Sequence, residues 1–252
     1  MQIKMVVTDL DGTLLREDKT ISERSLSALK QCRERGIKVV YATGRGSSAT
    51  FLVPEELFDG KVCANGAKAF AGNEPVYNKL MPSEHVRDLL IAADNVGVKI
   101  VAESGGWHYG NFDVTETWSW LPQSEIVDFV KLDIEVEKIY AILERPEDAE
   151  VIKRHLPEDT YLYLSRDGFA MVMHQDADKS KALAALAAHW STERSDIVSF
   201  GDDTNDIELL KYSGVGVAMG NALDEVKSVA DEICDANDND GIAKWLEECL
   251  KI

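Results

Sequence analysis

The chain has 252 residues, of which 45% are hydrophobic, and this is enough for one large domain or for a core domain with a second domain inserted into it. Its formal net charge of -18 repels phosphate backbones and anionic lipids, so we expect neither nucleic acid nor a membrane surface as a partner. No apolar run reaches the ~20 residues of a membrane span, no signal peptide is apparent, and four widely spaced cysteines predict reduced thiols, so we expect a cytoplasmic protein.

The first part of the chain alternates between strand and helix patterns. Apolar runs and helical spacing predict strands at 3–7, 37–42 and 62–64 and a helix at 22–35. Thr20 and Glu23 fit a capping box for this helix. A strand, helix and strand of these lengths imply a right-handed parallel crossover, and ligands of such sheets bind at the carboxyl ends of the strands.

The middle of the chain has a different pattern, rich in hairpins. The predicted elements are helices at 84–96 and 147–156 and strands at 99–103, 107–110, 137–143, 160–166 and 169–174. Asp167 and Gly168 form a strong hairpin signal between the last two strands. We therefore predict that residues 82–177 form a separate α+β domain inserted into the first domain.

The alternating pattern then returns. Helices are predicted at 179–189 and 242–250 with another one ending near 210, and strands at 196–200 and 215–219. Residues 1–81 and 178–252 are therefore expected to form one domain, and the fold class is α/β. We predict a three-layer, Rossmann-like core with a parallel sheet, interrupted by the inserted domain.

The end of the first strand carries two carboxylates, Asp9 and Asp11. Side chains two residues apart in an extended chain point to the same side, so both acids face one place. Two such charges repel each other and raise each other's pKa unless a cation lies between them. The pattern indicates a bound divalent metal, a shared proton, or both. Alone, it is also compatible with an acidic turn after a strand.

Two further strand ends carry polar clusters that share this edge of the predicted sheet. Thr43 and Gly44 follow one strand, and Asp202, Asp203 and Asp206 follow another. Several carboxylates at one edge require a cation, and oxygen ligands with few protein donors suit Mg²⁺, which often bridges to a phosphate.

Two other motifs are weaker. The glycine run at 214–220 lies within a strand and has one residue too many for a dinucleotide site. The acidic loop at 235–241 lacks the spacing and final Glu of a calcium loop, and we interpret it as a solvated turn.

The ordered motifs resemble those of the haloacid dehalogenase superfamily. The four motifs are Asp9-Leu10-Asp11-Gly12-Thr13, Thr43-Gly44-Arg45, Lys179 and Gly201-Asp202-Asp203-Thr204-Asn205-Asp206. Asn65-Gly66-Ala67, Ala218-Met219-Gly220-Asn221-Ala222, Ala230-Asp231 and Asp240-Gly241-Ile242 are similar to its Cof-type branch of sugar-phosphate phosphatases (subclass IIB). The resemblance covers the whole chain, and the insertion lies where that branch carries its cap.

The resemblance implies roles for the acidic residues. Asp9 would attack phosphorus and form an aspartyl-phosphate, and Asp11 would act as general acid and then as general base. Mg²⁺ would be held by the Asp9 carboxylate, the Asp11 backbone carbonyl and Asp202. Asp203 and Asp206 would orient the water molecules bound to the metal.

The resemblance also implies the residues that hold the phosphoryl oxygens, namely Thr43, Gly44, Lys179 and Asn205. The branch usually has Lys-Gly where this chain has Lys179-Ser180-Lys181, so Lys181 is an alternative to Lys179.

Residues of the cap are expected to select the substrate. The candidates for substrate contact are Arg45, Glu103, Trp107, Arg166 and His174. The aromatic residues of the cap, among them Trp107 and Trp118, fit either a stacking wall for a sugar or ring, or the packing of the cap core.

The sequence therefore predicts a Mg²⁺-dependent phosphatase that hydrolyses small phosphomonoesters, with sugar phosphates first. A phosphomutase of the phosphomannomutase type and a non-catalytic sensor of phosphorylated metabolites remain alternatives. The expected partner is a small phosphorylated metabolite, and the sequence leaves open whether the chain is a monomer or a homodimer.

Overall fold

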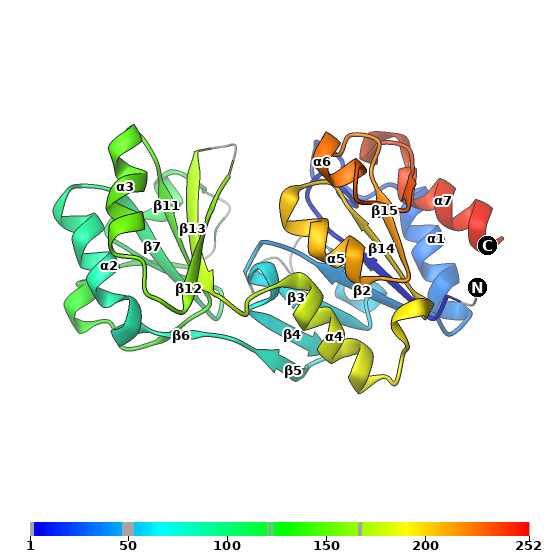
Figure 1. The fold of residues 1–252 in the computed structure, drawn as a ribbon, viewed down its shortest axis with the longest axis horizontal. Helices are drawn as coiled ribbons and strands as arrows, with labels where there is room; N and C mark the ends of the chain where they lie inside the picture. The colour runs from blue at the N-terminus through cyan, green and yellow to red at the C-terminus, as the bar shows by residue number, and fades with distance from the viewer. Residues whose placement is uncertain (1–2, 47–52, 120, 122, 166–167, 252) are drawn as a thin grey trace. The chain divides into compact units, whose positions relative to one another are not determined.

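A computed structural model describes residues 3–46, 53–119, 121, 123–165 and 168–251 of the chain (Figure 1). The chain divides into two compact units. The first, called the core below, comprises Met1–Arg45, Ala49–Asn78 and Asp178–Ile252. The second, called the cap, comprises Gly46–Ser48 and Lys79–Ala177.

The core is built on an eight-stranded sheet of order β16-β15-β14-β1-β2-β3-β4-β5. Its strands are β1 (Met5–Thr8), β2 (Lys38–Ala42), β3 (Gly60–Cys63), β4 (Lys68–Ala71), β5 (Glu74–Asn78), β14 (Ile197–Gly201), β15 (Val215–Ala218) and β16 (Glu232–Ile233). The strands from β16 to β3 run parallel, whereas β4 and β5 add an antiparallel edge that the sequence did not predict.

Helices cover both faces of this sheet. The helices of the core are α1 (Glu23–Glu34), α4 (Lys179–His189), α5 (Ile207–Tyr212), α6 (Asp224–Lys227) and α7 (Gly241–Leu250), with short 3₁₀ turns η2 (Glu55–Leu57), η3 (Ala64–Gly66), η6 (Arg194–Asp196), η7 (Thr204–Asp206) and η8 (Asn237–Asn239). Side chains of a strand alternate between faces, so Val6 joins the hydrophobic cluster of α1 and α7, whereas Met5 and Val7 join that of α4 and α5. The predicted three-layer α/β core is confirmed.

The first helix begins differently from the prediction. Ser22, not Thr20, is the N-cap residue, and its side chain accepts a hydrogen bond from the backbone N–H of Ser25. Thr20 instead donates its backbone N–H and its hydroxyl to the carboxylate of Asp18, in a local turn that precedes the helix. The predicted capping box of Thr20 and Glu23 is therefore wrong.

The cap contains a six-stranded sheet of order β12-β13-β11-β7-β8-β9 and a two-stranded sheet of β10 and β6. Its strands are β6 (Met81–Pro82), β7 (Lys99–Ser104), β8 (Trp107–Gly110), β9 (Ser124–Ile126), β10 (Glu135–Val136), β11 (Lys138–Ile142), β12 (Thr160–Leu164) and β13 (Phe169–His174), and its helices and turns are α2 (Ser83–Asn95), η4 (Val114–Glu116), η5 (Phe129–Lys131) and α3 (Pro146–Arg154). All pairs in the larger sheet are antiparallel except β8 with β9. The predicted α+β character of the insertion is confirmed.

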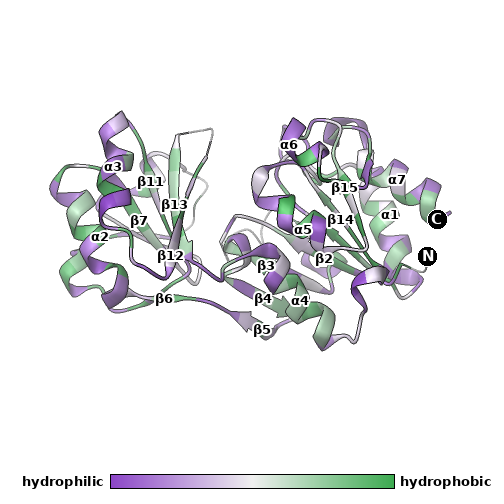
Figure 2. Ribbon diagram, in the orientation of Figure 1, coloured by the Kyte–Doolittle hydropathy of each residue, from purple (hydrophilic) through white to green (hydrophobic). Residues whose placement is uncertain are grey.

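One face of the cap sheet packs against helices, and hydropathy follows this division. Val86, Leu89 and Leu90 of α2 and Ile152 of α3 pack on the strand residues of that face, among them Ile139. In Figure 2 both helices alternate between hydrophobic and hydrophilic residues, as expected when one side of a helix is buried.

Two features of the structure concern the expected environment of the chain, namely its cysteines and the length and polarity of its helices. The four cysteines are free thiols, with Cys32 and Cys63 buried and Cys249 exposed. Within the described part of the chain, every helix is too short or too polar to cross a membrane.

The packing of α1 generates a prediction. Leu29 is fully buried between this helix and the sheet, whereas the next residue, Lys30, is exposed. We expect Leu29→Ala to lower the free energy of unfolding by about 2–5 kcal/mol, because a cavity replaces the side chain. Lys30→Ala is the control and should change it by less than about 0.5 kcal/mol in urea denaturation. Equal effects of the two substitutions would contradict this packing.

Candidate active site

The candidate site lies where three adjacent parallel strands end. β1 is flanked by β2 and β14 in parallel register, so the chain leaves all three strands at one edge of the sheet. The residues at these ends are Asp9 after β1, Thr43 after β2 and Asp202 after β14. The expectation that these strand ends meet is therefore met by the topology.

Three carboxylates gather at this edge. Asp9, Asp202 and Asp206 each contribute one oxygen to a group in which the oxygens lie within 4.8 Å of one another. Asp9 is only 6% exposed, and Asp206 is completely buried. Asp202 is partly exposed. Three negative charges so close together, two of them buried, require positive charge beside them.

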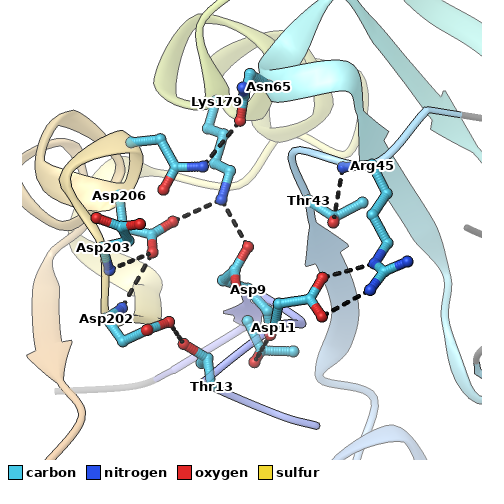
Figure 3. Close-up of polar contacts among 12 residues, drawn as sticks. Asp9, Asp11, Thr13, Thr43, Arg45, Asn65, Lys179, Asp202, Asp203 and Asp206 are labelled. Atoms are coloured by element: carbon cyan, nitrogen blue, oxygen red, sulfur yellow. Dashed lines mark hydrogen bonds and ion pairs between the residues drawn. The ribbon is translucent and has the colours of Figure 1, made fainter. Parts of the chain in front are cut away.

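Part of this positive charge comes from Lys179 at the start of α4 (Figure 3). Its Nζ donates to Asp9 Oδ1 at 2.6 Å and to Asp206 Oδ1 at 2.7 Å. Burial alone would lower the pKa of this lysine, but the ion pairs with Asp206 and Asp9 outweigh burial and raise it. Lys181, the alternative at this motif, is exposed on the same helix.

Asp206 organises the loop after β14. Its Oδ2 accepts the backbone N–H of Asp202 at 3.0 Å and that of Asp203 at 3.2 Å, while its Oδ1 is bound to Lys179. Both oxygens are thus engaged by donors of this chain. This carboxylate fixes the loop that carries Asp202.

Asp202 faces the turn after β1. Its Oδ1 accepts a hydrogen bond from the hydroxyl of Thr13 at 2.6 Å. A side chain at Gly12 would bring its Cβ within 2.4 Å of the other oxygen, and the φ of +79° also favours glycine there. Burial raises the pKa of Asp202 to about 7, with the charges of Asp206 and Asp203 adding to the increase and the Thr13 hydrogen bond opposing it.

The pKa of Asp9 is raised as well. Burial is the main cause, Lys179 opposes it, and the charges of Asp206 and Asp202 add to the increase. One lysine therefore leaves this cluster short of positive charge. The available donors are carboxylate oxygens, which are the ligands of hard divalent cations, so the residues present fit such an ion.

Asp11 lies in a different environment, between two cations. Arg45 binds it through two hydrogen bonds, Nε to Oδ2 at 2.6 Å and Nη2 to Oδ1 at 2.9 Å, and Lys19 Nζ donates to Oδ1 at 2.8 Å. Burial raises the pKa of Asp11, but these partners outweigh burial and lower it to about 2. Asp11 is therefore ionised in this arrangement, and Arg45, expected near substrate, is bound to it.

The loop after β2 carries two of the residues predicted to hold phosphate, Thr43 and Gly44. The Oγ1 of the buried Thr43 accepts the backbone N–H of Arg45 at 3.1 Å. Asn205 donates from its side-chain nitrogen to Asn65 Oδ1 at 2.9 Å. A Cβ added at Gly44 would lie 2.9 Å from that same oxygen of Asn65.

The predicted substrate residues of the cap do not share one face of its sheet. Register pairs Glu103 with both Lys138 and His108, which places all three on the face opposite the helices. Trp107 pairs with Ser104 and His174 pairs with Thr160, on the side of the sheet that the helices cover. Arg166 lies outside the described residues.

The helix-free face of the cap sheet carries buried polar groups. Glu103 is 1% exposed and forms an ion pair with Lys138 at 3.3 Å. The hydroxyl of Tyr140 and His108 Nδ1 share a hydrogen bond of 2.9 Å. Trp118 packs against Tyr140 with ring centroids 5.9 Å apart, as the packing interpretation of the cap aromatics expects.

On the other face, Trp107 is 40% exposed and stacks on Tyr109, with ring centroids 6.3 Å apart. The nitrogen Nδ1 of His174 accepts the backbone N–H of Asp176.

Three residues at the site had no predicted role. Lys19 reaches Asp11 from a left-handed backbone position with a φ of 65°, for which the sequence offers no signal. Asn65 belongs to a turn motif that the sequence displays, but its contact with Asn205 spans 140 residues. Asn221 donates to the backbone oxygen of Gly12 at 2.7 Å, a pairing that only the fold reveals.

Comparison with known proteins identifies the family. The family model of haloacid dehalogenase-like hydrolases matches residues 6–246. Among curated proteins, the chain is 27% identical to 5-amino-6-(5-phospho-D-ribitylamino)uracil phosphatase YitU of Bacillus subtilis, over 98% of each chain. It is 29% identical to phosphoglycolate phosphatase of Methanopyrus kandleri, over 98% of this chain and 97% of that protein.

Solved structures agree with this result. A haloacid dehalogenase-like hydrolase from Bacteroides thetaiotaomicron has a TM-score of 0.89 at 28% identity, and the match covers 98% of this chain and 100% of that one. A subclass IIB sugar phosphatase has a TM-score of 0.85 at 26% identity, with 99% and 100% of the chains covered. The chain therefore belongs to the haloacid dehalogenase-like hydrolase family and is an enzyme of the phosphatase type.

Proposed function

We propose that the chain is a Mg²⁺-dependent phosphatase that hydrolyses small phosphomonoesters, with sugar phosphates as the substrate class, through an aspartyl-phosphate on Asp9. The observation that carries the proposal is the group of Asp9, Lys179, Asp202 and Asp206 at the carboxyl edge of the sheet, of which all but Asp202 are buried. Phosphatases among the relatives and a sugar phosphatase among the similar structures support it.

Asp9 is the proposed nucleophile. Because Lys179 binds Oδ1, the oxygen that attacks phosphorus is Oδ2. A bond forms between this oxygen and phosphorus while the bond from phosphorus to the leaving alkoxide breaks. The lysine holds the carboxylate in one orientation, which lowers the entropic cost of reaching the attacking geometry.

Asp11 is the proposed acid and base. It would give a proton to the leaving oxygen and then take one from the water that hydrolyses the acyl-phosphate. Arg45 and Lys19 keep Asp11 ionised in the described arrangement, so the proposal requires that these contacts weaken when substrate binds and that Asp11 then takes up from solvent the proton that it donates. That exchange would couple proton donation to the arrival of substrate.

Asp9, the backbone carbonyl of Asp11 and Asp202 are the proposed ligands of Mg²⁺. When bound, the ion would neutralise the negative charge of the approaching phosphoryl group and of the carboxylates. Asp206 and Asp203 would orient the water molecules bound to the ion. Asp206 also fixes the loop that carries Asp202, because it accepts the backbone N–H groups of Asp202 and Asp203.

The proposed phosphoryl-binding groups are Thr43, the Gly44 amide, Lys179 and Asn205. In the cap, Glu103, which forms an ion pair with Lys138, is kept as a candidate for recognising the leaving group. Contact with the substrate remains a prediction for Trp107, His174, Arg45 and Arg166. A cytoplasmic location and a small phosphorylated metabolite as partner are also predictions.

The nucleophile gives the first test. We expect Asp9→Asn to reduce phosphate release from a phosphomonoester by about 10³-fold or more, because the amide oxygen is a poor nucleophile. Asp88→Asn changes an exposed residue of α2 and should leave the rate unchanged. Circular dichroism verifies that both variants fold. Phosphate release by folded Asp9→Asn at the wild-type rate would show that another group attacks phosphorus.

The crowded carboxylates give a test that needs no substrate. We expect Mg²⁺ at about 100 times its dissociation constant to stabilise the wild type by about 2.7 kcal/mol, which raises Tm by about 5–10 °C. Asp202→Asn should abolish most of this response, because it removes one ligand and part of the repulsion. NaCl at equal ionic strength is the control. A Tm of the wild type that does not change when Mg²⁺ is added would argue against the metal site.

The substrate class is tested with a panel of phosphorylated metabolites in the presence of Mg²⁺, with free phosphate as the readout. We expect the highest kcat/KM among sugar phosphates, and lower values for phosphoglycolate and for the ribitylaminouracil phosphate of the relative. A phosphodiester is the negative control. Preference for phosphoglycolate would overturn the substrate class, and a requirement for a sugar bisphosphate would indicate a phosphomutase.

A further inference from the structure

We propose that Asn65 is a positioning residue for the phosphoryl site, where its side-chain carbonyl orients the amide of Asn205. The inference rests on the proposed function, because Asn205 is one of the groups proposed to hold phosphate. All the contacts that carry it lie within the core.

Asn65 lies in a turn with an uncommon backbone. Ala64 and Asn65 follow β3 with φ values of 49° and 53°, in the left-handed region. This region is unfavourable for residues with a side chain, although asparagine tolerates it better than most. Two successive residues of this kind persist only where the surrounding structure holds them, and such places are common at functional sites.

The turn is tied to the loop that follows β2. The backbone N–H of Ala64 donates to the oxygen of Arg45 at 2.6 Å, and that of Asn65 donates to the oxygen of Thr43 at 3.0 Å. These bonds fix the turn against Thr43 and Gly44, the two residues proposed to meet phosphoryl oxygens. The turn therefore cannot move without moving this loop.

The same turn abuts the residue before Lys179. Gly66 has a φ of +99°, and a Cβ there would lie 2.2 Å from the backbone carbon of Asp178. Asp178 is the N-cap of α4, and its side chain accepts the backbone N–H groups of Ser180 and Lys181. One three-residue turn thus contacts the loop of Thr43 and the start of the helix that carries Lys179.

The side chain of Asn65 adds the third connection. It is 4% exposed, and its Oδ1 accepts from Asn205 Nδ2 at 2.9 Å. An amide nitrogen carries two hydrogens, so this bond uses one and directs the other to a second acceptor. Because Asn65 presents an oxygen, Asn205 must turn its nitrogen toward it. The orientation of the amide is therefore set before a phosphoryl oxygen arrives.

A double-mutant cycle tests this assignment. Asn65→Gly removes the carbonyl and keeps a residue suited to positive φ, and Asn205→Ala removes the amide that it orients. We expect each variant to lower kcat/KM by about 10-fold or more and to weaken binding of inorganic phosphate, measured by calorimetry with Mg²⁺, by a similar factor. The double variant should be no worse than Asn205→Ala alone, because residues that act through one another are not additive.

Asn73→Gly is the matched control, since Asn73 is exposed in the turn between β4 and β5. It should match the wild type in activity, phosphate binding and Tm. If the effects of the Asn65 and Asn205 substitutions multiply in the double variant, the assignment is overturned. Independent effects would mean that Asn65 does not act through the amide of Asn205. Unchanged phosphate binding in Asn65→Gly would overturn it as well.

The calorimetric measurement distinguishes a failure of this inference from a failure of the proposed function. A wild-type protein that binds phosphate but releases none from any ester refutes the phosphatase proposal, and the cycle in phosphate affinity still decides the role of Asn65. If the wild type is active and the two substitutions have independent effects, only the role of Asn65 is refuted, and the phosphatase proposal stands.

Discussion

The candidate site depends on the ion pairs of one buried lysine. Lys179 is fully buried, and it binds one oxygen of Asp9 and one of Asp206. A buried charge is costly unless it is paired and hydrogen-bonded, and removing one partner of such a group leaves the others uncompensated. The lysine therefore joins the end of β1, the loop after β14 and the start of α4 into a single unit. A metal ion would supply the remaining positive charge.

The fold explains why these groups meet. Parallel strands that are buried on both faces bring their carboxyl ends to one edge, and the crossovers between them place helix starts beside that edge. Asp9, Thr43 and Asp202 follow strands that are neighbours in space, although Asp9 and Asp202 lie 193 positions apart in the chain. The turn of Asn65 adds a support from β3, the next strand in the sheet. Four consecutive strands of the sheet thus contribute to one site.

Much of this arrangement could be predicted from the sequence, and the failures have physical causes. Buried strands and alternating helices have strong local patterns, so the core and the carboxyl ends of its strands were predictable. β4 and β5 are short, half-buried and partly polar, and their antiparallel pairing depends on neighbours that local patterns do not encode. The N-cap at Ser22 was misplaced because Thr20 competes through a local turn with Asp18.

In the site, residue types indicated the chemistry, whereas partners such as Lys19 for Asp11 and Asn65 for Asn205 required the fold. The roles of the site residues and the function of the cap remain predictions. The most direct measurement of the central claim is to quench the enzyme in acid during turnover of a ³²P-labelled phosphomonoester and map the labelled peptide. The account predicts an acid-stable acyl-phosphate on Asp9. Label on another residue, or turnover without a labelled protein intermediate, would contradict it.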